Sequence, residues 1–149
     1  MNRQFRYKTV KRVREIRERL AQKELAVRAR KVNEATEAIQ VLGDRKQAML
    51  DDVDRTRRDG FDLDREKIAW AQIGFMERQS AMLHDVRFER QQRLNAYRPQ
   101  VMAAMHEREM MDKLEEDHRE RVRLELSRDE ERRLAEMAVQ RYARKEKDR

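Results

Sequence analysis

The chain has 149 residues, of which 45 % are charged and 5 % are aromatic, and its formal net charge is +7. This composition excludes a thick globular core, but it can fill a narrow seam between two helices, where about two positions in seven are apolar. Disorder is the competing interpretation of so high a charge. Mixed charge signs and periodic apolar residues favour helices instead.

The sequence lacks the motifs of most enzymes and metal sites. It contains no cysteine, and no apolar run approaches the roughly 20 residues of a membrane span. His106-Glu107 is not followed by a histidine at the zincin spacing, and no glycine-rich phosphate loop is present. We therefore expect a cytoplasmic protein that is not an enzyme, with no cofactor, no metal and no direct membrane insertion.

The first predicted helix covers residues 1–58. Two apolar rows follow the a and d positions of a heptad: Leu25, Val32, Ile39 and Val53, then Ala35, Leu42 and Met49. Upstream, the apolar residues follow a shifted register: Val13, Ile16, Leu20 and Val27. A register slip is therefore predicted between Leu20 and Leu25.

A turn is predicted at residues 59–64. Gly60 gives the backbone conformational freedom, and Asp62 or Asp64 can cap the next helix. The second predicted helix covers residues 65–149 and frays after about residue 140. Its apolar pattern is looser: Ile68, Ala71, Phe75, Met82, Val86, Leu94, Tyr97, Val101, Ala104, Met111 and, farther on, Leu114, Val122, Leu134, Met137 and Ala138.

Pro99 interrupts this second helix. A proline inside a helix removes one hydrogen bond and costs roughly 3 kcal/mol. We interpret it as a kink, because the apolar periodicity resumes at Val101, and a break between two helices is the alternative.

These elements predict an all-α fold: an antiparallel two-helix coiled-coil hairpin in a single domain, 1–149, with an overhanging C-terminal helix. Residue i then faces about residue 122 − i, and the overhang begins near residue 118. The charges agree with an antiparallel arrangement, because it places residues 1–31, with a net charge of +9, beside residues 107–131, with a net charge of −5.

The N-terminal helix is strongly basic, with Arg3, Arg6, Lys8, Lys11, Arg12, Arg14, Arg17 and Arg19. Such a run is usually a solvated face, and its functional interpretation is contact with an acidic protein surface. Binding of DNA or RNA is an alternative, although Glu15 and Glu18 interrupt the run. The nine methionines fill gaps in the seam or form an adaptable surface for several partners.

Two stretches resemble the FliJ family, the coiled-coil component of the flagellar type III export ATPase complex. The first is Phe5-x-Tyr7-x-x-Val10-x-x-Val13-Arg14-x-Ile16-x-Glu18, followed by Ala21-x-x-Glu24-Leu25-Ala26. The second is Glu125-x-x-x-Asp129-Glu130-x-x-x-Leu134-Ala135-Glu136-x-Ala138-x-x-Arg141. Chain length, the single turn and the lack of cysteine also fit this family.

The resemblance implies a stalk that inserts in a hexameric export ATPase and promotes its assembly. It also implies four partners: that ATPase, its regulatory or stator protein, the membrane export gate and export chaperones. No nucleic acid is expected, and the protein would lie at the cytoplasmic face of the inner membrane through its partners. The stalk protein of a virulence type III system and a generic coiled-coil adaptor are alternatives.

The resemblance also suggests contact residues. The export-gate set is Leu42, Arg45, Met49, Phe75 and Met76, in which Arg45 and Met49 replace an aromatic pair of the family. The ATPase-ring set is Arg12, Arg14, Arg17, Arg19, Arg133 and Arg141.

Overall fold

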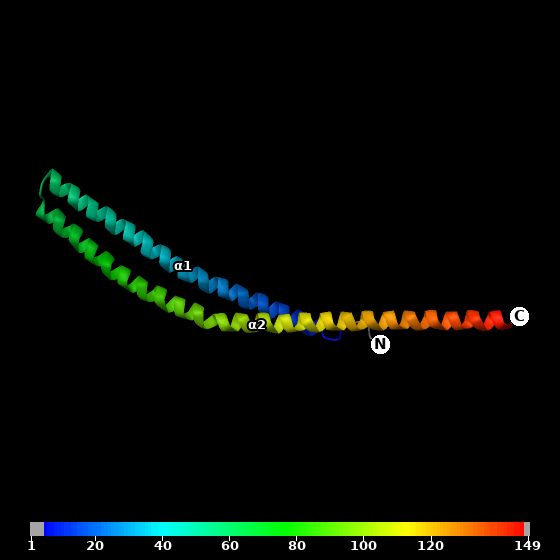
Figure 1. Cartoon of the computed structure of the whole chain (residues 1–149). Coiled ribbons are helices and arrows are strands. Elements are labelled where there is room, and N and C mark those ends of the chain that lie inside the picture. Colours follow the sequence, from blue (N-terminus) through cyan, green and yellow to red (C-terminus); the bar gives the residue numbers. More distant parts are fainter. Residues whose placement is uncertain (1–4, 148–149) are drawn as a thin grey trace. The chain divides into compact units, whose positions relative to one another are not determined.

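The computed structural model describes residues 5–147, with side chains through residue 144. It contains two helices, α1 (Lys8–Asp59) and α2 (Leu63–Lys147), and no strand within the described residues. Their packing confirms the predicted all-α, antiparallel helical hairpin (Figure 1). The contacts divide the chain into a turn unit, residues 19–102, and a terminal unit, residues 1–18 with 103–149, which we describe separately.

The turn joining the helices is Gly60–Asp62, shorter than the predicted 59–64. Gly60 has a positive φ of 154°, and its N–H donates to the Thr56 carbonyl at 3.0 Å. The Asp62 carboxylate accepts from the backbone N–H of Asp64 at 3.1 Å and of Arg65 at 3.3 Å. Asp62 is therefore the N-cap of α2, because it satisfies two donors that the helix itself leaves unpaired.

In the turn unit, residue i faces residue 123 − i, one residue from the predicted relation. The Lys46 ammonium lies 2.7 Å from the Glu77 carboxylate, and Arg57 Nε donates to Glu66 at 2.8 Å. Apolar side chains between the helices form the core: Val32, Ala35, Val53, Ile73, Leu94 and Val101. Ile73 is the least exposed of them, at 2 %. The seam is therefore one side chain deep on each helix, as the composition predicted.

The α1 heptad runs without a slip, so the predicted register slip is wrong. Every position that continues the Leu25–Val32 register, from Lys11 to Thr56, is buried or half-buried. Leu20 is 61 % exposed, whereas the charged Glu18 is 8 % exposed. The register prediction failed because the upstream a and d positions of α1 hold charged residues, while apolar residues occupy its outer face.

The seam of α2 also differs from part of the prediction. Near the turn it contains Ile73, Met76, Ser80 and Leu83, which are buried or half-buried. The predicted seam residues Ile68, Phe75, Met82 and Val86 are exposed. Beyond this stretch, Leu94, Tyr97, Val101, Ala104 and Met111 lie in the seam as predicted.

Helix α2 continues through Pro99, so the alternative of a break between two helices is wrong. Pro99 is exposed and lies two positions from both Tyr97 and Val101 of the seam, on the outer face. A proline on the outer face leaves the seam intact. The backbone carbonyl that loses its hydrogen bond to the proline position is then open to water. The kink itself stays a prediction.

The terminal unit pairs the start of α1 with the middle of α2. The Phe5 and His118 rings lie 5.8 Å apart, and the Lys11 ammonium lies 2.7 Å from the Asp112 carboxylate. Beyond this pairing α2 continues to Lys147, and every side chain from Leu126 to Arg144 is exposed. The overhanging helix is thus confirmed, and fraying after residue 140 stays a prediction.

Candidate partner-binding surfaces

The described residues contain no cluster of histidine, cysteine, aspartate or glutamate that could hold a metal ion. A search of the described helices found none with the length and apolar character needed to span a membrane. Three surfaces are candidates for binding a partner: two in the turn unit and one in the terminal unit.

An apolar groove runs along one side of the turn unit. It is lined by Ala38, Val41, Leu42 and Arg45 of α1 and by Gln79, Met82, Leu83 and Val86 of α2. Val41 and Met82, which face each other across it, are 49 % and 59 % exposed. Neighbouring apolar side chains that remain this open to water are typical of a site for another protein.

Apolar side chains extend this groove toward the turn. Ile68, Phe75 and Met82 recur at seven-residue spacing on α2, and all three are exposed. Seven residues are close to two helical turns, so the three side chains share one face. The apolar groove and this row form one candidate surface, which we call the groove surface.

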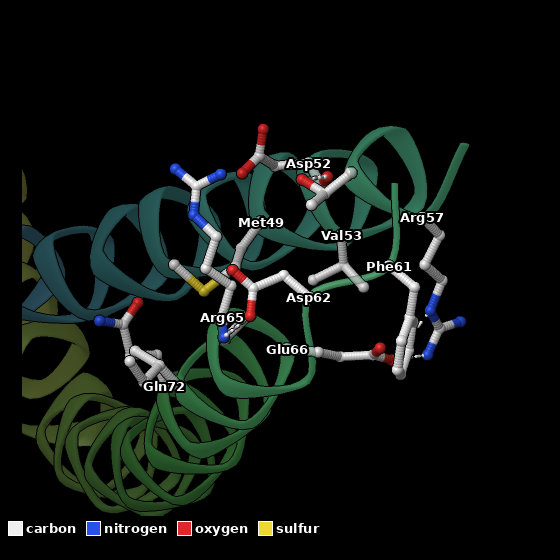
Figure 2. Close-up of a pocket in the computed structure, with 12 residues that line it drawn as sticks. Met49, Asp52, Val53, Arg57, Phe61, Asp62, Arg65, Glu66 and Gln72 are labelled. Carbon is white, nitrogen blue, oxygen red and sulfur yellow. Dashed lines mark hydrogen bonds and ion pairs between the residues drawn. The ribbon is translucent and has the colours of Figure 1, made fainter. Parts of the chain in front are cut away.

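A second hollow lies beside the turn (Figure 2). Twelve residues line it: Met49, Asp52, Val53, Thr56, Arg57, Phe61, Asp62, Arg65, Glu66, Ile68, Ala69 and Gln72. The Arg57–Glu66 ion pair lowers the pKa of Glu66, and Trp70 Nε1 donates to the same carboxylate at 3.3 Å. Most polar groups here serve the turn itself, so the hollow is a weaker candidate than the groove surface.

The predicted export-gate residues are only partly brought together. Leu42 and Arg45 line the apolar groove, and Phe75 lies on the row that extends it. Met49 lines the hollow beside the turn, and Met76 is half-buried in the seam. The contact of this set with a gate stays a prediction.

The terminal unit has a charged seam, formed by Lys11, Arg14 and Glu18 of α1 and Glu107, Arg108, Asp112 and Glu115 of α2. Arg108 Nε donates to Glu18 at 2.5 Å, and Arg108 also binds Asp112. Lys11 binds both Asp112 and Glu115, and Arg14 binds Glu107. Ion pairs therefore link the helices here, whereas in the turn unit the Lys46–Glu77 and Arg57–Glu66 pairs accompany an apolar core.

These ion pairs shift the titration of their members. Lys11 is the largest cause that lowers the pKa of both Asp112 and Glu115, and in return those carboxylates raise the pKa of Lys11. Glu18 raises the pKa of Arg108. Each shift favours the charged forms, because each charge has an opposite partner within hydrogen-bonding distance.

The predicted ATPase-ring arginines divide into two groups. Arg12, Arg17, Arg19, Arg133 and Arg141 are exposed and available to a partner. Arg14 is half-buried and paired with Glu107, so its guanidinium already serves the charged seam.

Sequence reasoning missed Val41, Met82 and Val86 as one surface. It assigned Met82 and Val86 to the seam and did not consider Val41. The signal was present, because the α1 register from Lys11 to Thr56 leaves Val41 outside every a and d position.

One of the comparisons with known proteins gave a match. The family model described as "Flagellar FliJ protein" matches residues 3–147. No curated protein and no solved structure gave a significant match.

Proposed function

Because the chain belongs to the FliJ family of flagellar proteins, we propose that it is the stalk and assembly factor of the flagellar type III export ATPase. In this role it inserts in the hexameric ATPase ring, contacts the regulatory or stator protein and reaches the membrane export gate. It also escorts export chaperones. It is held at the cytoplasmic face of the inner membrane by these partners.

The exposed groove surface is the observation that carries this proposal. Its row of Ile68, Phe75 and Met82 remains open although both helices are already paired through another face. An apolar surface that the hairpin does not use for its own stability supports a role in holding a partner. We assign it to the export gate, with Leu42, Arg45 and Phe75 as contacts. Met49 in the hollow beside the turn and Met76 in the seam complete the predicted set.

The exposed arginines support the ring contact. Arg12, Arg17 and Arg19 lie on α1, and Arg133 and Arg141 lie on the overhanging part of α2. Guanidinium groups in water attract a carboxylate-bearing surface over about one Debye length. The contact should therefore weaken as salt concentration rises.

The ring contact is tested by binding and ATP hydrolysis with the purified export ATPase. Addition of the chain should stimulate hydrolysis, and Arg12→Glu/Arg17→Glu should reduce both binding and stimulation at least tenfold. Arg55→Glu/Arg98→Glu is the matched control, because it changes the same charge at two exposed positions of the turn unit. Equal loss in both double variants, or no stimulation by the native chain, contradicts the assignment.

The gate contact is tested separately with the soluble part of the gate. Met82→Asp should reduce binding at least tenfold. Phe88→Asp is the matched control, because Phe88 is another exposed apolar residue of α2 and does not line the groove. Unchanged binding by Met82→Asp, with native helix content by circular dichroism, rejects the groove surface as the gate contact.

A further inference from the structure

The two units of the hairpin are held by different forces. In the terminal unit α1 presents Lys11, Arg14 and Glu18 to the seam, whereas four heptads later the same positions hold Ile39, Leu42 and Lys46. The part of α1 in residues 8–18, which we call the strap, therefore gives the seam no large apolar side chain at these positions. Its attachment depends on the ion pairs with α2.

The α2 side of this interface is mixed. Arg108, Asp112 and Glu115 bind the charges of the strap, and Met111 is the buried apolar residue among them. The side chains of Arg108, Asp112 and Glu115 retain 29 %, 39 % and 21 % of their exposure. Salt ions can reach these groups, so their attraction is screened more strongly than that of a fully buried pair.

Apolar contacts respond differently to salt. The Debye length falls from about 10 Å at 0.1 M salt to about 3 Å at 1 M, so charges are screened more strongly and ion pairs weaken. The same change does not weaken burial of Val32, Ala35 and Ile73 in the turn unit, because the hydrophobic effect does not depend on attraction between charges.

We propose that the strap is a releasable clasp, which separates from α2 when its ion pairs are screened or competed while the turn unit stays paired. Release frees Lys11 and Arg14 from their carboxylates and uncovers Met111. A carboxylate-rich protein surface is the chemistry that competes for these two cations. This regulation does not depend on the identity of the partner in the proposed function.

The experiment measures two distances in the full-length chain. Because the chain has no cysteine, paired spin labels can be placed by substitution alone. The strap pair is Val13→Cys/Met110→Cys, and the control pair is Val41→Cys/Met82→Cys, which occupies the same heptad positions four heptads away. All four native side chains are exposed, so the labels do not enter the seam.

At 0.1 M salt both pairs should give one short distance. At 1 M salt the short-distance fraction of the strap pair should fall by at least half, while the control pair should not change. A strap pair that ignores salt, a strap already open at 0.1 M, or simultaneous opening of both pairs overturns the proposal.

A variant with a more apolar seam tests whether the ion pairs cause the salt-dependent opening of the strap. Lys11→Ile, Arg14→Leu, Glu18→Leu, Arg108→Leu and Glu115→Leu together remove at least one member of each ion pair that joins the two helices in the charged seam. The strap of this variant should stay closed at 1 M salt. If it opens as the native strap does, the ion pairs are not the clasp, and the proposal is wrong.

Discussion

Glu18 is a carboxylate in a seam position, 8 % exposed and bound by Arg108 at 2.5 Å. Burial of a charge is unfavourable unless opposite charges and hydrogen bonds compensate it. A partner on the other helix thus makes Glu18 a determinant of how α1 and α2 align in the terminal unit.

Neutralising this carboxylate should loosen the strap. We expect Glu18→Gln to raise hydrogen exchange of the backbone amides of residues 12–18 about fivefold, because a hydrogen bond to a charged group contributes on the order of 1 kcal/mol or more. Mass spectrometry of peptic fragments measures this. Glu37→Gln, at an exposed position of α1, should leave the same amides unchanged, and equal effects of both variants would contradict the argument.

The strap should also respond to pH, with a sign that follows from its pKa shifts. The pKa values of Asp112 and Glu115 lie below the ordinary 3.8 and 4.5. Their contribution is therefore present above those values and is lost as pH falls through the lowered ones. The pKa of Lys11 is raised above 10.5, so its contribution is complete below that value and is lost as pH rises through the raised one.

We thus expect the strap to be most firmly closed between about pH 5 and pH 10. At constant ionic strength, the short-distance fraction of the strap spin-label pair should be constant in that window and fall below pH 4. A pair that stays closed at pH 2, with the control pair closed as well, would show that carboxylate charge is not required.

At the scale of the elements, Gly60 and Gly43 differ in backbone conformation and should respond in opposite ways to an added side chain. Gly60 has a positive φ of 154°, whereas Gly43 lies within α1 with no atom within 4 Å of an added Cβ. Gly60→Ala should lower the free energy of unfolding by about 1–3 kcal/mol, because a side chain strains that backbone. Gly43→Ala should raise it by about 0.5–1 kcal/mol through helix propensity. Urea denaturation of the two variants measures both, and shifts of the same sign would contradict the argument.

Pro99 should weaken the helix that contains it. Pro99→Ala restores a backbone donor within α2 and should raise the free energy of unfolding by up to about 3 kcal/mol. Calorimetry or urea denaturation measures the change. An unchanged or lowered stability would contradict the argument.

The sequence predicted the elements well because strong helix formers and one turn leave few alternatives. Gly60 with Asp62 located the turn, and Leu25, Val32 and Ile39 located the seam of the turn unit. The register upstream of Leu20 was mispredicted, because an amphipathic pattern shows an apolar face without saying whether that face meets its partner helix. Lys11 and Glu18 are seam residues only because matching charges stand on α2, and one sequence does not reveal that match.

The candidate surfaces were harder to predict than the fold, because one sequence does not reveal how the two helices align. The proximity of Val41 and Met82 can be predicted only when the pairing of residue i with residue 123 − i is known. A predicted register that is wrong by one or two residues would separate them. Leu42 and Arg45 were found because the resemblance supplied them, whereas Met82 was mistaken for core. A surface that joins two helices thus depends on register more strongly than either helix does.

At the scale of the whole molecule, the overhanging part of α2 should contribute to partner binding but not to the stability of the hairpin. Helix α2 beyond Ser127 buries none of the side chains described there, so it adds little packing to the hairpin. It does carry Arg133 and Arg141, two of the arginines assigned to the ATPase ring. A chain that ends at Ser127 should thus keep the free energy of unfolding of the native chain within about 0.5 kcal/mol.

The same truncated chain should bind the export ATPase at least tenfold more weakly, while its binding to the soluble part of the gate should not change. Urea denaturation and affinity measurements on one preparation test the three expectations together. A chain that begins at Arg19 is the contrasting variant, because it loses the ion pairs of the charged seam together with Arg12 and Arg17. It should therefore lose stability as well as affinity for the ring. If loss of the overhanging helix destabilises the hairpin by several kcal/mol, that helix packs against something in the free protein, and its arginines are not freely available to the ring.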